Sequence, residues 1–126
     1  MKEWNEELIK QSKYDLDTAK YMYEGRRYLY TIFMCHLCIE KAFKALYYFK
    51  TQKLPPKTHN LIFFIEELNL EMDNVIHKFV INLNQLSIVT RYPEDFSKTS
   101  KQFNKTRTKN FIKETERTFL WIKQQL

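Results

Sequence analysis

The strongest constraint on the fold is the apolar pattern of residues 28–50, which read YLYTIFMCHLCIEKAFKALYYFK. Hydrophobic side chains recur there at steps of three and four residues, at Ile32, Cys35, Ile39, Phe43, Leu46 and Phe49. Such steps place the side chains in one stripe along an α-helix. A helix of this length would be about 35 Å long, which is roughly the height of a small domain. The pattern therefore predicts the central helix of a bundle.

The composition also favours long helices. The chain has 126 residues, which is the size of a single domain with a substantial core, and we expect residues 1–126 to form one domain. Hydrophobic residues make up 44% of the chain and aromatic residues 16%. One glycine and three prolines are too few for a turn-dense β fold or a disordered chain.

Apolar periodicity predicts one helix before the central one. It covers about residues 2–24, and its inner face includes Trp4, Leu8 and Leu16. Gly25 follows where a helix C-cap often needs a permissive backbone, so the first two helices should form an antiparallel hairpin.

Three more helices are expected after the central one. Pro55 and Pro56 end the central pattern, and Thr58 is the expected N-cap of a short third helix, with His59 in its first turn. A fourth helix follows from about residue 75 and stops before Pro93, and residues 91–100 look like a loop. The final helix is well patterned after residue 110, whereas the polar residues 98–109 could fray or project. The predicted fold is an all-α, up-and-down bundle of about five helices.

The positive charge is confined to the C-terminal segment. Residues 1–96 hold equal numbers of basic and acidic side chains, whereas residues 97–126 hold eight Lys and Arg against Glu114 and Glu116, which accounts for the net charge of +6. Such asymmetry favours contact with RNA, another polyanion or an acidic protein. The candidate contact residues are Lys101, Lys105, Arg107 and Lys109. A solvated helix face with surplus lysine is the alternative.

Cofactor, metal and membrane motifs are not apparent. Cys35 and Cys38 form a C-x-x-C within the central helix, without the second cysteine pair of a zinc site or the βαβ pattern of a redox site, so core packing is expected. We therefore expect no cofactor and no metal. The N-terminal residues lack the apolar stretch of a signal peptide, and no apolar run is long enough for a membrane span. A cytoplasmic location is expected.

Several segments together resemble a known family. They are Trp4 and Asp15-Leu16 in the first helix, CHLCIEKAFKAL at residues 35–46, PPKTHNL at residues 55–61 and TRYPED at residues 90–95. In this order and spacing they look like a HEPN domain. The resemblance implies a helical bundle that commonly forms homodimers. Small HEPN proteins are often encoded beside a minimal nucleotidyltransferase in two-gene, toxin–antitoxin-like systems. Many members are metal-independent ribonucleases, and others are proposed to bind nucleotides.

The ribonuclease members of the family carry an Arg followed, after about four to six residues, by a His. No such pair occurs here, because the histidines are His36, His59 and His77, and none follows Arg91 or falls at that spacing after Arg26 or Arg27. The sequence therefore departs from the nuclease pattern. Metal-independent RNA cleavage needs a base for the 2′-hydroxyl proton and a cation for the phosphate, and Arg91 could supply only the cation.

A candidate site can still be assembled around Arg91. Arg91 and Tyr92 offer a cation and an aromatic face for a phosphate or a base. His36, Glu40 and Lys44 lie at successive steps of four residues on the central helix, and His59 follows the proline exit. These six residues could line one cleft. Each also has a structural alternative: Arg91 could cap its helix or pair with Glu40, Glu40 and Lys44 could be helix-face partners, His36 could be a core histidine, and His59 could orient a helix start.

Three functions are compatible with these residues. The first is a HEPN binding and assembly module, a homodimer that partners a minimal nucleotidyltransferase and binds nucleotide or RNA near Arg91, with Tyr92 as an acceptor for a nucleotidyl group. The second is a metal-independent ribonuclease toxin that uses His36 or His59 with Arg91. The third is a helical adaptor whose cleft is filled by apolar side chains. We favour the first.

Overall fold

The computed structural model describes residues 2–126, and the side chains of residues 4–126. Its described residues form six helices, namely α1 (Lys2–Glu24), α2 (Tyr28–Thr51), α3 (Leu61–Glu67), α4 (Asn74–Arg91), α5 (Phe96–Lys101) and α6 (Lys105–Gln124). No strand occurs among the described residues. The all-α bundle predicted from the sequence is confirmed, with one short helix more than expected.

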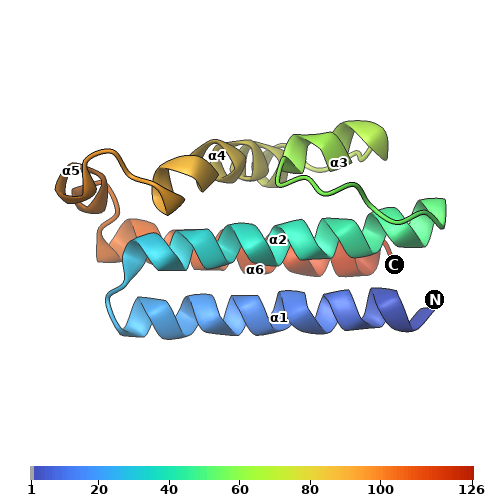
Figure 1. The fold of residues 1–126 in the computed structure, drawn as a ribbon, viewed down its shortest axis with the longest axis horizontal. Helices are drawn as coiled ribbons and strands as arrows, with labels where there is room; N and C mark the ends of the chain where they lie inside the picture. Colours follow the sequence, from blue (N-terminus) through green and yellow to red (C-terminus); the bar gives the residue numbers. More distant parts are fainter. Residues whose placement is uncertain (1) are drawn as a thin grey trace.

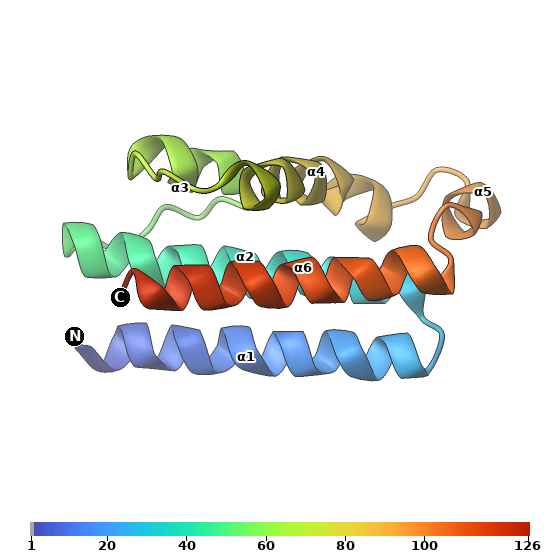
Figure 2. The ribbon, with the colours of Figure 1, turned by 180° about the vertical axis from the view of Figure 1, so that it is seen from behind.

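Helix α2 is central, as its apolar pattern predicts. It packs against α1, α6, α4 and α3, and α1 and α2 form an antiparallel hairpin. Figures 1 and 2 show α1 on one side of the α2 and α6 pair and the shorter α3 and α4 on the other side. The two ends of the chain lie at the same end of the bundle. No helix in the described residues 2–126 is long and apolar enough to cross a membrane.

The predicted apolar stripe of α2 forms the centre of the core. Ile32, Cys35, Ile39, Phe43 and Leu46 are completely buried. They pack against buried side chains from the other helices, including Leu16, Leu61, Phe64, Val80, Leu83, Phe103, Phe111, Phe119 and Ile122. Phe49, the last member of the predicted stripe, is 45% exposed because the helix extends there beyond most of its neighbours.

The left-handed residue at the end of α1 is Arg26, not Gly25 as the sequence suggested. Arg26 has φ 61°, and no glycine has a positive φ among the described residues. The Arg27 amide donates to the Met22 carbonyl (2.8 Å), and the Arg26 amide donates to the Tyr23 carbonyl (3.0 Å). This is the Schellman pattern, in which the left-handed position is one residue beyond the C-cap. The helix extends through Glu24, so the left-handed position falls on Arg26.

The third helix also begins later than predicted. Its N-cap is Asn60, whose side chain accepts a hydrogen bond from the Ile62 amide (3.1 Å), and not Thr58. Thr58 Oγ1 instead accepts from the Asn60 amide (3.1 Å) in a turn that precedes the helix. His59 therefore lies in the connecting segment and not in the first helical turn, which corrects the expectation from the sequence.

Residues 91–109 are more regular than the sequence indicated. Asp95 caps the short helix α5 through the Lys98 amide (3.0 Å), and Asn104 caps α6 through the Arg107 amide (2.8 Å). Phe103 lies between the two helices and is almost completely buried against Phe111. The expected loop is thus partly helical. The buried Phe103 side chain anchors this segment, whose polar composition had suggested that it would fray or project.

Candidate functional site

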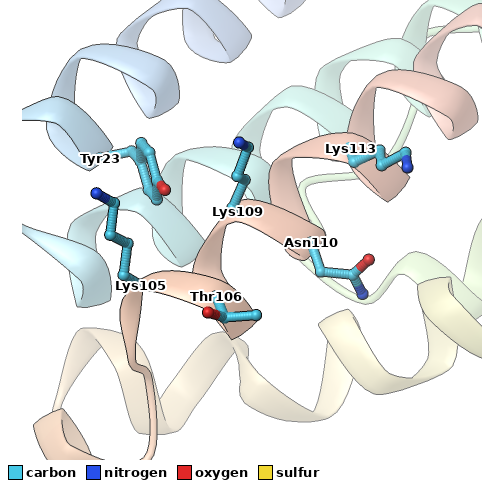
Figure 3. Close-up of a pocket in the computed structure, with 6 residues that line it drawn as sticks. All are labelled: Tyr23, Lys105, Thr106, Lys109, Asn110 and Lys113. Carbon is cyan, nitrogen blue, oxygen red and sulfur yellow. The ribbon is translucent and has the colours of Figure 1, made fainter.

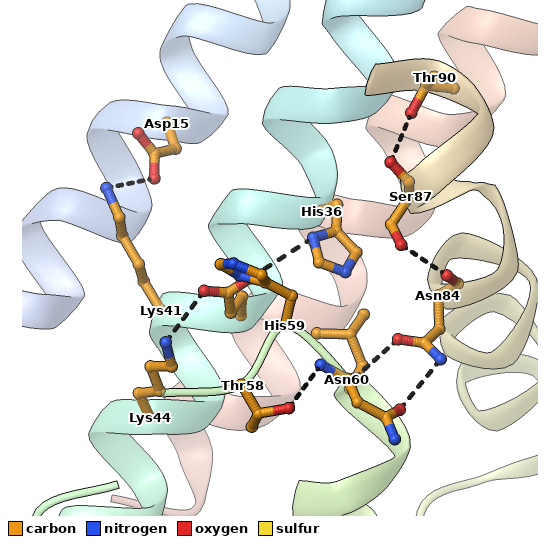
Figure 4. Close-up of polar contacts among 12 residues, drawn as sticks. Asp15, His36, Lys41, Lys44, Thr58, His59, Asn60, Asn84, Ser87 and Thr90 are labelled. Atoms are coloured by element: carbon orange, nitrogen blue, oxygen red, sulfur yellow. Dashed lines mark hydrogen bonds and ion pairs between the residues drawn. The ribbon is translucent and has the colours of Figure 1, made fainter. Parts of the chain in front are cut away.

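A buried carboxylate on α2 gathers three of the predicted site residues. Glu40 is 4% exposed. Its Oε2 atom accepts a hydrogen bond from Lys44 Nζ (3.0 Å), and its Oε1 atom lies 2.8 Å from His59 Nδ1. His36 Nδ1 is 3.7 Å from the same Oε1 atom. Figure 4 shows His36, Lys44 and His59 converging on this point from α2 and the segment before α3.

The local sequence explains how these groups meet. His36, Glu40 and Lys44 are four residues apart, so they lie above one another on one face of α2. His59 comes from a different segment. Helix α2 ends at Thr51, where Gln52 has a left-handed conformation, and Pro55 and Pro56 keep the following residues from resuming the helix as the chain returns along α2. The expected helix-face pair of Glu40 and Lys44 is present, and His59 links the returning chain to α2.

His36 is completely buried beside this carboxylate. Burial lowers the pKa of His36 to about 4; the Glu40 carboxylate opposes this shift, and the positive charge of Arg91 adds to it. Neither ring nitrogen of His36 has a hydrogen-bond partner within the described side chains. The imidazole is therefore neutral near pH 7 and shielded from solvent, which favours the core-histidine interpretation over that of a base that touches substrate.

Arg91 provides a cation that pairs with no acidic side chain of residues 4–126. It is the last residue of α4, and its guanidinium lies 4.7 Å from the centre of the Phe33 ring. Its Nε atom is buried and has no hydrogen-bond partner among residues 4–126. Glu40 pairs with Lys44 and His59 and not with Arg91, so the buried Arg91–Glu40 pair considered from the sequence does not form in the described structure. An arginine placed over an aromatic ring keeps its donors available for an anion.

A pocket of about 390 Å³ lies beside Arg91. Of the predicted residues, His59, Arg91 and Tyr92 line it. The other lining residues are Asn60, Asn84, Ser87 and Ile88. The pocket lining does not include His36, Glu40 or Lys44. Their connection to the pocket is the contact between Glu40 and His59. The structure thus separates the six candidates into three at the pocket and three that support it.

Two asparagines that the sequence reading missed fix the pocket wall. Asn84 Oδ1 accepts a hydrogen bond from the Leu61 amide (2.7 Å), and Asn84 Nδ2 donates to Asn60 Oδ1 (3.1 Å). Ser87 Oγ donates to the Asn84 carbonyl (2.8 Å). The two bonds of the Asn84 side chain attach the start of α3 to α4, whereas the Ser87 bond lies within α4, as Figure 4 shows. The sequence contains one feature that could have indicated this role, the polar side chain of Asn84 within the apolar pattern of α4, next to the buried Leu83.

The basic candidates of the C-terminal segment divide into two groups. Lys105 and Lys109 line a groove on α6 together with Tyr23 of α1. Arg107 points elsewhere: it donates to the Gln102 carbonyl (2.8 Å), and its guanidinium lies 4.5 Å from the centre of the Phe103 ring. Lys101 is exposed on α5 and is not among the residues that line the groove.

Neither cysteine belongs to a reactive or metal site. Cys35 and Cys38 are free thiols in the core, and burial raises the pKa of Cys35 to about 12 and that of Cys38 further. Ser12 Oγ donates to the Cys38 carbonyl (2.6 Å), which connects α1 to α2. Within the described residues, no cluster of three His, Cys, Asp or Glu side chains could hold a metal ion. Core packing of the two cysteines is the role that the sequence predicted.

Comparison with known proteins identifies the family. Residues 5–125 match the HEPN domain, which is nearly the whole chain. The chain belongs to the HEPN family. The resemblance noted in the sequence is therefore confirmed, and HEPN domains are often involved in nucleotide or RNA handling and often dimerise. No curated protein matches the sequence significantly.

Two solved structures share the HEPN fold of this chain. The TT1696 protein from Thermus thermophilus has a TM-score of 0.83 at 12% identity, with 97% of this chain and 98% of that chain covered. The archaeal HEPN homologue ST0689 has a TM-score of 0.75 at 22% identity, with 96% of each chain covered. At these identities the likeness establishes the fold alone.

Proposed function

We propose that this HEPN domain is a binding and assembly module whose pocket beside Arg91 binds the phosphate of a nucleotide or an RNA. The observation that carries the proposal is the arginine itself. Its guanidinium rests on Phe33, its buried Nε has no partner among the described side chains, and it borders a pocket of about 390 Å³. A positive charge held in this way is best stabilised by an anion that enters the pocket.

The other pocket residues suit the remainder of a nucleotide. Tyr92 is 79% exposed next to Arg91 and offers an aromatic face on which a base can stack. Asn60, Asn84 and Ser87 offer amide and hydroxyl groups for the polar edges of a base or a sugar. Every lining residue except Ile88 carries a polar or charged group, which favours a binding module over an adaptor whose cleft is filled by apolar side chains.

Calorimetry with AMP, ATP and inorganic phosphate tests the proposal. Arg91→Ala should weaken binding at least about tenfold, because a charge-assisted hydrogen bond is lost. The affinity of Arg91→Lys should lie between those of the native protein and Arg91→Ala, because lysine keeps the charge but lacks the planar fork. Arg27→Ala removes the same charge from an exposed residue outside the pocket and should bind as the native protein does. Equal affinities for native protein and Arg91→Ala would exclude the site.

The proposal includes a cytoplasmic homodimer that partners a minimal nucleotidyltransferase in a two-gene, toxin–antitoxin-like system. Exposed apolar side chains on the pocket rim support a dimer: Ile88 is 73% exposed and Tyr92 is 79% exposed, one helical turn apart. Tyr92 is also the proposed acceptor. Its phenol oxygen would attack the α-phosphate of a nucleoside triphosphate held by the partner enzyme and release pyrophosphate.

Mass spectrometry of the intact protein tests the acceptor role. Incubation with a minimal nucleotidyltransferase and ATP should add one nucleoside monophosphate to the native protein, and Tyr92→Phe should remain unmodified. Tyr14→Phe is a matched control, because Tyr14 is 73% exposed on α1, away from the pocket. Equal modification of the Tyr92→Phe protein would exclude Tyr92 as the acceptor.

Metal-independent RNA cleavage is a second candidate, and one observation favours it. The His59 side chain is 65% exposed at the same pocket as Arg91, and its Nδ1 is oriented by the buried Glu40. A carboxylate that holds a histidine in this way leaves Nε2 to act as a base. Labelled RNA incubated with the protein in EDTA should then be cleaved, and His59→Ala and Arg91→Ala should each abolish cleavage. Intact RNA with the native dimer would eliminate this candidate.

A further inference from the structure

A second hollow of the surface lies between α1 and α6. It has a volume of about 480 Å³, and Lys105, Lys109 and Lys113 of α6 line it together with Tyr23 of α1. Thr106 and Asn110 complete its lining. Figure 3 shows Lys105 and Lys109 extending to either side of the Tyr23 side chain, with Lys113 farther along the helix. We call this feature the α6 groove. It shares no lining residue with the Arg91 pocket.

The positions of the three lysines are electrostatically unfavourable for the fold. They are four residues apart, so neighbouring ammonium groups repel one another along one face of α6. Lys105 is the first residue of the helix, where the helix dipole disfavours a cation. Within the described side chains, the acids of this helix are engaged elsewhere, since Glu116 pairs with Lys20 (2.7 Å) and Glu114 with Arg117 (3.7 Å). An external anion would relieve this repulsion.

The spacing of the charges indicates an extended polyanion. Steps of four residues separate the lysines by about 6 Å along the helix axis, so the row can contact several successive charges of a linear chain. The groove has no aliphatic side chain among its lining residues, whereas protein interfaces usually centre on a buried apolar anchor. Tyr23 instead offers an aromatic ring among the cations. Cations interleaved with an aromatic ring are the usual means of binding single-stranded nucleic acid.

We propose that the α6 groove binds the backbone of single-stranded nucleic acid, with Lys105, Lys109 and Lys113 on successive phosphates and Tyr23 stacked on a base. The groove revises the polyanion surface expected from the sequence. It omits Lys101 and also Arg107, which is folded onto Phe103, and it adds Lys113 and Tyr23, a residue from the other end of the chain. The proposal goes beyond the nucleotide pocket and does not depend on it.

Fluorescence anisotropy with a labelled single-stranded RNA of about 12 nucleotides tests the groove. The triple variant Lys105→Gln, Lys109→Gln and Lys113→Gln should weaken binding at least about tenfold and should reduce the slope of log K against log salt by about 2. The matched variant Lys50→Gln, Lys53→Gln and Lys78→Gln removes the same charge from exposed positions outside the groove and should keep affinity within about threefold. Equal losses in both variants would overturn the proposal.

Further comparisons identify the ligand and the role of the aromatic ring. Tyr23→Phe should bind as the native protein does, and Tyr23→Leu should bind about tenfold more weakly, because only the leucine variant loses stacking. Circular dichroism verifies that each variant is folded. Single-stranded DNA of the same sequence should also depend on the three lysines, since the phosphodiester backbone is common to both. Equally tight, lysine-dependent binding of poly-glutamate would overturn the proposal in favour of an acidic protein surface. The triple lysine variant should keep the native affinity for AMP in calorimetry, which separates the test of the groove from that of the Arg91 pocket.

Discussion

At the scale of single residues, the site combines two kinds of charge. Glu40 is buried but surrounded by donors, so its charge is stabilised from within the protein. Arg91 rests on an aromatic ring and has no acidic partner among the described residues. The first arrangement holds the structure together, and the second is suited to receive a ligand. His36 lies between the two and is neutral, which gives it a measurable signature in the pH dependence of stability.

The depressed pKa of His36 should make the fold weaker in mild acid. The pKa is about 4 in the folded protein and about 6.5 in the unfolded chain, so the unfolded chain binds more protons between these values. The stability that neutral His36 contributes is therefore fully present above about pH 6.5 and is lost as the pH falls toward 4. Relative to His36→Leu, the native protein should lose about 3 kcal/mol of unfolding free energy between pH 7 and pH 4.

Urea denaturation across this pH range measures the effect. Asp15→Asn provides a comparison of opposite sign, because burial raises the pKa of Asp15 despite the nearby Lys41, and a raised carboxyl pKa lowers stability as pH rises. The native curve should therefore rise with pH more steeply than that of His36→Leu and less steeply than that of Asp15→Asn. Parallel curves for the native protein and His36→Leu would show that His36 does not titrate between the two states as its burial implies.

Removal of the Glu40 carboxylate should destabilise the fold. Glu40→Ala leaves Lys44 and His59 without their common acceptor and opens a small cavity, and we expect a loss of about 2 kcal/mol in unfolding free energy. The partly exposed partners can turn to water, which keeps the loss below that of a fully enclosed pair. Asp17→Ala is the control, since it breaks the exposed Lys13–Asp17 pair and should cost less than about 0.5 kcal/mol. Similar losses would show that burial does not distinguish the two pairs.

At the scale of helices, the caps and connections decide the geometry of the pocket. Asn84 is the main connection, because it joins α4 to the first turn of α3 with two hydrogen bonds. The connection from α1 to α2 depends instead on a residue in an unfavourable backbone conformation. Each of these features predicts a different response to substitution.

Asn84→Ala should loosen α3. The substitution leaves the amide of the buried Leu61 without its acceptor, which should cost about 2 kcal/mol of unfolding free energy. Amide hydrogen exchange at Leu61 and Ile62 should accelerate more than exchange in α6. Asn82→Ala, at an exposed position of the same helix, should change stability by less than about 0.5 kcal/mol. Unchanged protection of α3 in Asn84→Ala would refute the connection.

Arg26→Gly should stabilise the protein. Arg26 has φ 61°, a region that disfavours side chains with a Cβ atom, so glycine should raise the unfolding free energy by about 1 kcal/mol. Arg27→Gly is the matched control: Arg27 has φ −95°, where glycine brings no relief of strain. Thermal and urea denaturation measure both. A destabilised Arg26→Gly protein would indicate that the Arg26 side chain makes a larger contribution than its backbone strain.

At the scale of the whole molecule, the two proposed anion-binding surfaces are separate. The pocket beside Arg91 lies between α4 and the segment that precedes α3, and the α6 groove lies between α1 and α6. The rim of the pocket carries Ile88 and Tyr92, the apolar side chains that support the proposed dimer. An isologous interface at this rim would bring two Arg91 pockets close together.

Ile88→Glu should therefore disrupt the dimer. Each copy would place a carboxylate in an apolar contact that is repeated by symmetry, and dimer affinity should fall at least about tenfold. Size-exclusion chromatography with light scattering measures the change as a function of concentration. Tyr14→Glu is a matched control, since Tyr14 is also 73% exposed but lies on the outer part of α1. A dimer that survives Ile88→Glu would show that the rim is not the interface.

The sequence by itself determined the helical bundle and its centre. The three- and four-residue spacing from Ile32 to Leu46 reflects a purely local property, the 3.6-residue period of a helix, and all five side chains of that stretch of the stripe are buried. The four-residue spacing of His36, Glu40 and Lys44 likewise predicted one face. Motif order along the chain was sufficient to identify the HEPN resemblance that the family match confirms.

Only the tertiary structure decided which charges meet and which remain available. His59 and Glu40 are nineteen positions apart, and Tyr23 and Lys105 come from opposite parts of the chain, so no local period relates them. The same holds for Asn84, whose partners on α3 set where that helix begins, and for Arg107, which folds onto Phe103. Helix periodicity is encoded between near neighbours. The pairing of a buried charge depends on whichever side chain the packed helices bring within a few ångströms.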